Sequence, residues 1–214
     1  MGFVKSKIFG HNEKMESTEK ANPGTAFYNF NTPPGLTCPQ AGECESWCYA
    51  KTGRYLFPSV KNKMKKNYEL SQRDDFGFIV DQELQRLQRK QPDKKIYIRW
   101  NDAGDIYDAA YLSKLVSIAW RNMNVNFYSY TKSVKLVKDA IAGGLMIPPN
   151  YHITFSFGGK QDDLIQPEDR QARVFGTAEE AEECWHDASH NDMVTYNEQK
   201  ICLPYHGMEG RFRR

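Results

Sequence analysis

The sequence lacks the two features that would take a chain to or through a membrane. It contains no apolar run long enough to span a bilayer and no segment with the pattern of a secretory signal. We therefore expect a cytoplasmic protein without a membrane partner, in a reducing compartment where thiols stay free. Excess charge is also small, at +2 over 214 residues, so the chain as a whole selects no charged class of partner.

Cysteine is scarce, with five residues in the chain, yet three of them lie together in the loop at 38–50. Cys38, Cys44 and Cys48 have the spacing C-x5-C-x3-C. Packing as small apolar groups explains this cluster poorly, because Pro39 and Gly42 make the segment a turn-rich loop with little core to fill. A disulfide would leave one thiol unpaired. Thiolates are soft ligands, and the pattern therefore indicates a metal or iron–sulfur site.

A second short pair of cysteines, the usual complement of a zinc knuckle, is also missing. Three close cysteines and a distant fourth favour a [4Fe-4S] cluster, with a zinc-stabilised protein as the alternative. The same arrangement suits a cluster whose fourth iron is open to a small molecule. The spacing is close to the C-x3-C-x2-C of radical S-adenosylmethionine (SAM) enzymes but does not match it.

The fourth coordination position has several candidates. Cys202 is the best one in the protein, because it ends a predicted strand and precedes a loop containing Pro204 and Gly207. Cys184 comes second, since it lies in an acidic predicted helix where a thiolate is less favoured. A histidine is a third source of a ligand. If the protein supplies none, the open iron would be available to SAM.

Strand-like and helix-like segments alternate in the region 95–203, which we expect to form an α/β core. Strands are expected at 96–100, 125–130 and 151–157, and helices at 107–123 and 133–142. This alternation predicts βαβ units, and hence a partial (βα) barrel or an open, mostly parallel sheet. The chain is predicted to be one domain over 1–214, with an N-terminal arm at 1–37 before the cysteine loop.

Weaker signals place further elements outside these units. Helices are expected from Pro58 and over 74–89 and 177–185, and short strands at 27–30, 193–196 and 199–202. In the helix over 74–89, Phe78, Leu84 and Leu87 are expected to face the core.

Polar residues follow the predicted strands at their carboxyl ends, where parallel α/β proteins usually place their functional sites. Asp102 and Asp105 follow the strand at 96–100 and could accept hydrogen bonds from a ribose or an ammonium group. Lys132 follows the next strand and could bind a carboxylate or a phosphate. The alternatives are that the aspartates only cap helices and that the lysine is an ordinary surface residue.

Charged residues are unevenly distributed along the chain. The segment 161–198 is acidic, and the helix expected from Pro58 is basic. Its lysines are Lys61, Lys63, Lys65 and Lys66. A solvated helix face explains these lysines, and the alternative is a contact with a partner protein or a nucleic acid.

Two blocks of motifs resemble the bacteriophage family called gene product 88. The first block, at 34–50, reads PGLTCP, then Cys44, then WCYA. The second reads IRWNDAGD at 98–105, then Tyr111, then FYSYTKS at 127–133. The order of the parts is also similar to that of a phage group, related to spore photoproduct lyase, that is regarded as radical-SAM-like.

The resemblance covers roughly residues 34–160 and implies a partial (βα) barrel with an iron–sulfur cluster at its mouth. It implies no particular reaction. Gly104 and Asp105 are candidates for the glycine-containing SAM motif of such a protein. A phage origin would place the protein in the cytoplasm of the host.

Two functions therefore stay open. In the first, the protein is a small radical-SAM-like enzyme, in which the cysteine loop holds three irons, SAM chelates the fourth, and the polar strand ends bind SAM or substrate. In the second, it is a non-catalytic phage protein, stabilised by a cluster or by zinc, whose basic helix binds a host protein or a nucleic acid. A cluster closed by Cys202 would leave no open iron for SAM, so the fourth ligand distinguishes them.

Overall fold

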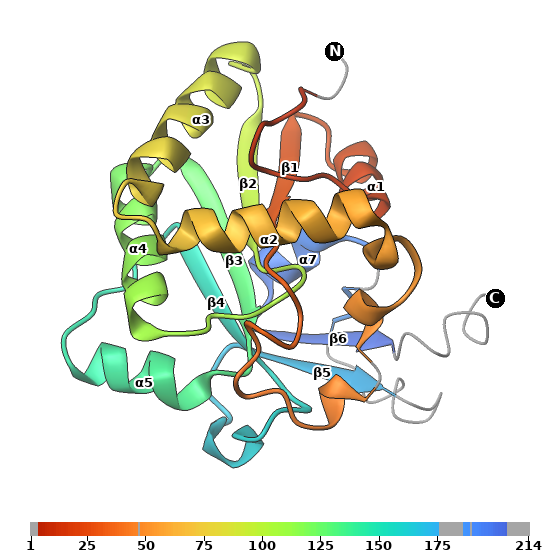
Figure 1. The fold of residues 1–214 in the computed structure, drawn as a ribbon, viewed down its shortest axis with the longest axis vertical. Coiled ribbons are helices and arrows are strands. Elements are labelled where there is room, and N and C mark those ends of the chain that lie inside the picture. The colour runs from red at the N-terminus through yellow and green to blue at the C-terminus, as the bar shows by residue number, and fades with distance from the viewer. Residues whose placement is uncertain (1–3, 47, 176–185, 189, 205–214) are drawn as a thin grey trace.

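Six parallel strands form one curved sheet in a computed structural model that describes residues 4–46, 48–175, 186–188 and 190–204. The strands are β1 (Thr25–Phe30), β2 (Lys95–Trp100), β3 (Val125–Thr131), β4 (Tyr151–Ser156), β5 (Gln171–Phe175) and β6 (Lys200–Pro204). They lie side by side in sequence order, and neighbouring strands are parallel. The sheet curls as a half barrel (Figure 1). The predicted partial (βα) barrel is confirmed.

Helices cover both faces of the sheet. The helices on the outer face are α3 (Phe76–Lys90), α4 (Ala109–Arg121) and α5 (Val134–Ala142), which connect successive strands. Those on the inner face are α1 (Glu13–Ala21), which precedes β1, and α7 (Asp192–Asn197), which connects β5 to β6. The long helix α2 (Pro58–Gln72) lies in front of the sheet in Figure 1. The amide of Asn67 on α2 donates to the carbonyl oxygen of Asn31, just past the end of β1, at 3.0 Å. None of the helices in the described ranges is long and apolar enough to span a bilayer.

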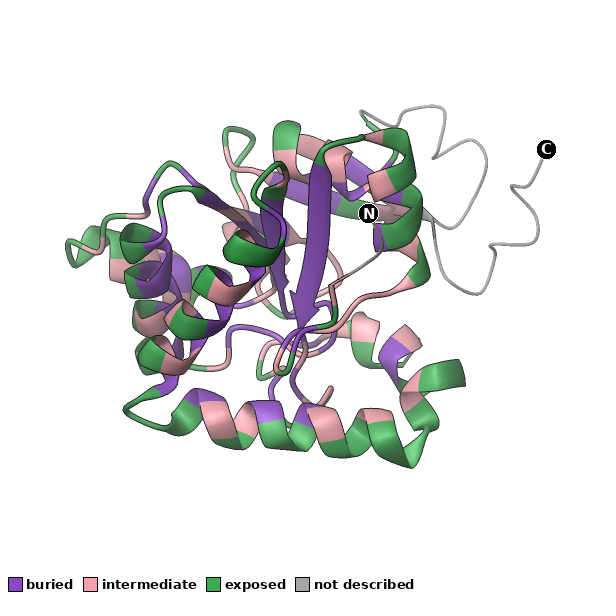
Figure 2. Cartoon of the chain, turned by 90° about the horizontal axis from the view of Figure 1, so that it is seen from above, coloured by how far each residue is buried: buried purple, intermediate pink, exposed green. Residues whose placement is uncertain are grey.

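The outer face carries the main hydrophobic core. Alternate residues of β2, namely Ile96, Ile98 and Trp100, point to this face and are buried, as the period of two along a strand requires. Leu84 and Leu87 of α3 belong to the same cluster, three residues apart on one helix face. The strands β1, β2 and β3 are accordingly buried over most of their length, and the outward sides of the helices are exposed (Figure 2).

The inner face changes from aromatic to polar toward the carboxyl ends of the strands. Phe27 of β1, Tyr97 of β2 and Tyr128 of β3 form a buried aromatic cluster with Met15 of α1. Two residues beyond Tyr97 on the same face, the buried Arg99 begins a polar layer. The inner helices therefore fill the half barrel toward the amino ends of the strands. Polar side chains remain near its mouth, at the carboxyl ends of the strands.

The segment 1–37, predicted to be an arm, belongs to the fold over its described residues, and that prediction is wrong. β1 pairs with β2 along its whole length, from Thr25 opposite Lys95 to Phe30 opposite Trp100. All six residues of β1 are buried. A parallel strand buried on both faces carries no alternating pattern, which explains why its place in the sheet was missed.

Local predictions near the carboxyl end of the chain are less accurate. The residues 193–196, predicted to be a strand, lie in α7, because the residue before that helix caps it with its side chain. β5 has no counterpart among the predicted elements. Phe78 is 63% exposed, since it lies off the stripe of α3 that buries Leu84 and Leu87. The predicted helix over 177–185 lies outside the described residues.

Glu83 of α3 anchors the amino-terminal segment to the outer face. Its carboxylate accepts hydrogen bonds from the Ser6 hydroxyl at 2.7 Å and the Lys7 backbone N–H at 2.9 Å, and it pairs with Arg86 at 2.8 Å. Burial raises the pKa of Glu83, but these donors outweigh burial and lower the pKa to about 2.

We predict that Glu83→Gln lowers the free energy of unfolding at neutral pH by roughly 1–3 kcal/mol, because it weakens charge-assisted hydrogen bonds to a buried group. Since the native pKa is lowered, this stabilisation is present above the unfolded pKa of 4.5 and is lost as the pH falls toward about 2. Urea unfolding of both proteins at about pH 7 and about pH 3 should show a smaller difference at the lower pH.

Glu69→Gln is the matched control, because Glu69 is exposed and lies 3.9 Å from the exposed Lys65. Its effect should stay below about 0.5 kcal/mol at either pH. A Glu83→Gln effect of the same size at both pH values would contradict the proposed anchoring by the ionised carboxylate.

Candidate functional site

The cysteine loop closes over the carboxyl ends of the strands, as predicted. Cys38, Cys44 and Cys48 are half-buried free thiols that line one cavity of about 130 Å³. Residues at the ends of β2, β3 and β4 line the same cavity, together with Val174 of β5 and Leu203 of β6. The mouth of the half barrel is therefore the place where the sequence motifs meet.

Close backbone contacts hold the loop against the end of β4. The Cys44 N–H donates to the carbonyl oxygen of Gly158 at 3.1 Å. A Cβ on Gly42 would lie 2.8 Å from the carbonyl carbon of Gly159. Real Cβ atoms essentially never come so close, so the approach of the two backbones requires glycine.

Gly104 brings the loop after β2 equally close to the segment before the first cysteine. Its φ is +87°, and a Cβ there would overlap the Thr32 hydroxyl and lie 2.6 Å from the Thr37 hydroxyl oxygen. Because Thr37 directly precedes Cys38, Gly104 helps to set the position of that thiol. This packing accounts for the glycine that the sequence suggested as part of a SAM motif.

Asp102 fastens the cysteine loop to the end of β2. Its Oδ2 accepts hydrogen bonds from the Tyr55 hydroxyl at 3.0 Å and the Asn12 amide at 2.9 Å, and its Oδ1 lies 3.1 Å from Arg99 Nη1. Tyr49, the residue after the third cysteine, donates to the Asp102 carbonyl oxygen. The carboxylate predicted to bind a ribose or an ammonium group therefore already has several protein donors.

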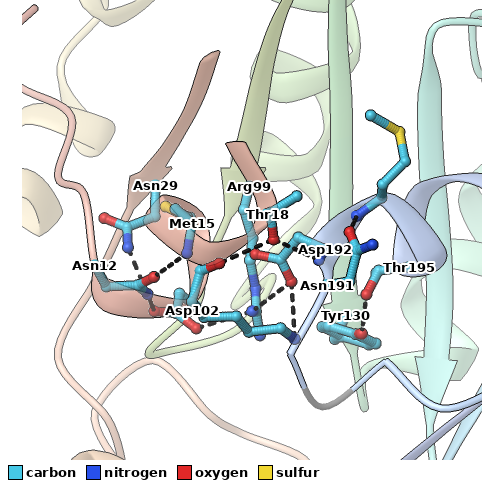
Figure 3. A network of polar contacts seen from close by, with 12 residues as sticks. Asn12, Met15, Thr18, Asn29, Arg99, Asp102, Tyr130, Asn191, Asp192 and Thr195 are labelled. Carbon is cyan, nitrogen blue, oxygen red and sulfur yellow. Dashed lines mark hydrogen bonds and ion pairs between the residues drawn. The ribbon is translucent and has the colours of Figure 1, made fainter. Parts of the chain in front are cut away.

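Arg99 is the centre of a buried charge network (Figure 3). Its Nη1 lies 3.1 Å from Asp102 and 3.5 Å from Asp192 of α7, and Lys14 of α1 approaches Asp192 at 2.9 Å. The guanidinium also lies 4.9 Å from the ring centroid of Tyr130. Burial lowers the pKa of Arg99, but the two carboxylates outweigh burial and hold the pKa well above its usual range. The network joins α1, α7, β2 and β3 directly beneath the cysteine loop.

Sequence reasoning did not single out Arg99, Tyr49 or Tyr55. The available signal for Arg99 was its position inside the apolar run of β2, where a charge needs a buried partner. The two tyrosines carried no comparable signal, because their acceptor lies about fifty residues further along the chain.

Asp105 and Lys132 connect adjacent strand ends. Asp105 accepts hydrogen bonds from the backbone N–H of Lys132 at 3.0 Å and of Ile106 at 2.6 Å. The Lys132 ammonium donates to Ser156 Oγ at 2.9 Å and to the Phe157 carbonyl oxygen at 2.6 Å. Burial raises the pKa of Asp105 to about 6, although these N–H groups act in the opposite direction. Both residues line the cavity, with protein partners already in place, and their role in binding a cofactor stays a prediction.

The environment of Cys38 and Cys44 favours the protonated form of these two thiols. Burial raises the pKa of Cys38 to about 12, and the Asp105 carboxylate adds to this effect. Burial also raises the pKa of Cys44, where the charge of Lys132 acts in the opposite direction. A bound cation reverses this preference, because coordination deprotonates a thiol.

As the structure describes them, the three cysteines do not form a ready-made site for one metal ion. Across the described ranges, no group of three or more His, Cys, Asp or Glu side chains is arranged to hold one metal ion. A zinc site needs thiolates that converge on one point at about 2.3 Å. In a cluster each thiolate binds a different iron, so the ligands surround a volume.

Cys202, the predicted fourth ligand, is buried on β6 and is 1% exposed. Its neighbour Leu203 lines the cavity, and the alternation of a strand turns Cys202 to the opposite face. Cys202 is also disulfide-bonded, so it offers a metal no thiolate until that bond is reduced. Ligation by Cys202 stays an untested prediction that the disulfide and the orientation count against, and Cys184 lies outside the described residues.

The four lysines of α2 do not share one surface. Lys63 points into the protein and donates to the carbonyl oxygen of Phe9 at 2.6 Å, and burial lowers its pKa. Lys61 and Lys65, one turn apart, line a groove beside the cysteine loop, whereas Lys66 is exposed outside it. The helical period therefore divides the set that the sequence grouped together.

Comparison with known proteins gives one match. A family model described as gene product 88 matches residues 5–210 of the chain. No curated protein and no solved structure matches it. The matched range includes the cysteine loop and all six strands of the sheet.

We predict that Gly104→Ala destabilises the protein more than Gly144→Ala. Both glycines have a positive φ, at +87° and +96°, which costs an L residue about 1–2 kcal/mol. Nothing lies within 4 Å of a Cβ at Gly144, whereas a Cβ at Gly104 would overlap Thr32 and crowd Thr37. Urea unfolding should show an additional loss of at least about 1 kcal/mol for Gly104→Ala. If the two variants lost the same free energy of unfolding, the close approach of Gly104 to Thr32 and Thr37 would contribute nothing to stability.

Proposed function

The chain belongs to the gene product 88 family, and we propose that it binds an iron–sulfur cluster, of the [4Fe-4S] type, through Cys38, Cys44 and Cys48. The observation that carries the proposal is the position of three free thiols around one cavity at the carboxyl ends of parallel strands. Zinc is the less suitable occupant, because the described ligands do not converge on one point.

The chain's own groups would control the surroundings of the bound metal. A [4Fe-4S] cluster supplies one-electron transfer when bound. Lys132, whose charge acts on Cys44, would offset part of the negative charge of the thiolates. The contacts of Gly42 and Gly104 hold the loop close to the strand ends.

A radical-SAM-like enzyme is the finer form of this proposal. Arg99 Nε and Asn101 Nδ2 are buried atoms of cavity-lining residues and have no hydrogen-bond partner in the described part of the chain. Asn101 also has a φ of +56°, a strained conformation that is common at functional sites. Unpaired buried polar atoms favour a bound ligand or water near them.

The existing partners of the other strand-end residues favour the non-catalytic alternative. Asp102, Asp105 and Lys132 hold the loop and the strand ends together, so SAM would have to displace these contacts or use other groups. In this alternative the cluster stabilises the loop, and exposed lysines of α2 contact a host protein or a nucleic acid.

We predict that protein purified without oxygen is brown and contains about four irons and about four sulfides per chain. Cys44→Ser should remove the colour and most of the iron, and it should lower stability because ligation and folding are coupled. Ser46→Ala is the matched control, because Ser46 is exposed in the same loop. This variant should keep the colour, the iron content and the stability of the unaltered protein. Absorbance and metal analysis measure the outcome. A colourless protein with one zinc per chain would refute the cluster.

Cys202→Ala separates the two coordination schemes. Because Cys202 is disulfide-bonded and faces away from the cavity, we expect the variant to keep its iron. Loss of the cluster to the extent seen with Cys48→Ser would instead identify Cys202 as the fourth ligand. With the cluster retained, electron paramagnetic resonance of the reduced protein distinguishes the functions. A change on adding SAM would support the enzyme, and no change would support the non-catalytic protein.

A further inference from the structure

A groove lies beside the cysteine loop, between α2 and the segments 33–36 and 50–56. Its volume of about 560 Å³ falls within the range of small-molecule sites. Met64 and Ala50 form a buried apolar floor, whereas Leu36 is 67% and Leu56 50% exposed in the same groove. Large apolar side chains gathered at a concave surface indicate a place that a ligand covers.

The rim of this groove carries more lysines than carboxylates: three lysines and Glu69 line it, and Lys51 is paired with Glu45 at 3.1 Å. Lys61 and Lys65, one helical turn apart on α2, both line it, as does Lys51 of the cysteine loop. Lys61 makes no ion pair with any residue that the structure describes, and Lys65 lies 3.9 Å from the exposed Glu69. An exposed pair at this distance contributes little, so both ammonium groups are available to an anion at the edge of the apolar floor.

We propose that the groove binds an amphiphilic organic anion, a small molecule with an apolar body and one anionic group. The floor would bury the apolar body, while Lys61 and Lys65 would hold the anionic group at the rim. A single-stranded nucleic acid fits less well, because the rings of Tyr55 and Tyr68 are already engaged in T-shaped pairs with Tyr49 and Tyr107 instead of forming an open stacking platform. The concave shape and small volume also suit a small molecule better than a protein surface.

The groove adjoins the cysteine cavity. Pro34, Ala50 and Lys51 line both of them, and Cys48 packs against the buried pair Ala50 and Met64. A molecule in the groove would therefore lie beside the cysteine loop, as a substrate or an effector of that site. The inference requires no cluster, because every group that carries it belongs to the folded chain.

The probe is 8-anilinonaphthalene-1-sulfonate, an apolar ring system with one sulfonate. Fluorescence titration should show saturable binding at one site per chain. The double variant Lys61→Glu/Lys65→Glu should weaken this binding by about tenfold or more, because it replaces two attractive charges by repulsive ones. N-Phenyl-1-naphthylamine has the same rings without the sulfonate, and its binding should change by less than about twofold in this variant.

Two further variants complete the design. Lys66→Glu is the charge control, since Lys66 is exposed on the same helix outside the groove, and it should leave binding of both probes unchanged. Leu36→Asp alters an exposed residue of the apolar lining and should weaken both probes. Circular dichroism and urea unfolding establish that each variant is folded. Cys44→Ser should still bind the sulfonate probe, so failure of the cluster proposal and failure of this one are separate results.

Equal binding of the sulfonate probe by the double variant and by Lys66→Glu would overturn the proposal. So would a Leu36→Asp variant that binds both probes normally. If a single-stranded oligonucleotide displaced the probe, and the double variant bound neither the probe nor the oligonucleotide, that result would reassign the groove to nucleic acid. Displacement by an acidic peptide in the same manner would reassign it to a protein partner.

Discussion

Neutralising the buried charge of Arg99 is the constraint on which the mouth of the half barrel depends. A guanidinium taken out of water needs carboxylates at close range, and losing one partner of such a pair typically costs several kcal/mol. Asp102 comes from the loop after β2 and Asp192 from α7. Meeting this requirement places α7 on the inner face of the sheet. It also fixes Asp102, to which Tyr49 and Tyr55 of the cysteine loop are hydrogen-bonded.

The same contacts determine which groups are left for chemistry. Asp102, Asp105 and Lys132 are occupied in holding loops and strand ends together. The three thiols of the loop line one cavity as free thiols, and burial disfavours the thiolate forms of Cys38 and Cys44. The proposed cluster would remove this penalty, because coordination by a positively charged metal centre deprotonates a thiol.

Sequence signals were sufficient where one local pattern decided the structure. The strands near Ile98 and Phe127 and the position of the cysteine loop were predicted in this way, because apolar runs and turn residues dominate there. For residues 193–196 the predicted strand is wrong. Their β-branched side chains favour a strand, whereas burial of Asp192 against Lys14 and a side-chain cap favour the helix. The roles of the strand-end residues depend on partners more than twenty residues away, which no local pattern contains.

X-ray absorption at the iron edge of anaerobically prepared protein tests the central claim most directly. A cluster on the cysteine loop predicts a shell of sulfur around iron and a second shell of neighbouring iron, both absent from Cys44→Ser. Iron coordinated only by nitrogen and oxygen, or an iron signal that survives in Cys44→Ser, would contradict the assignment of the three thiols as cluster ligands.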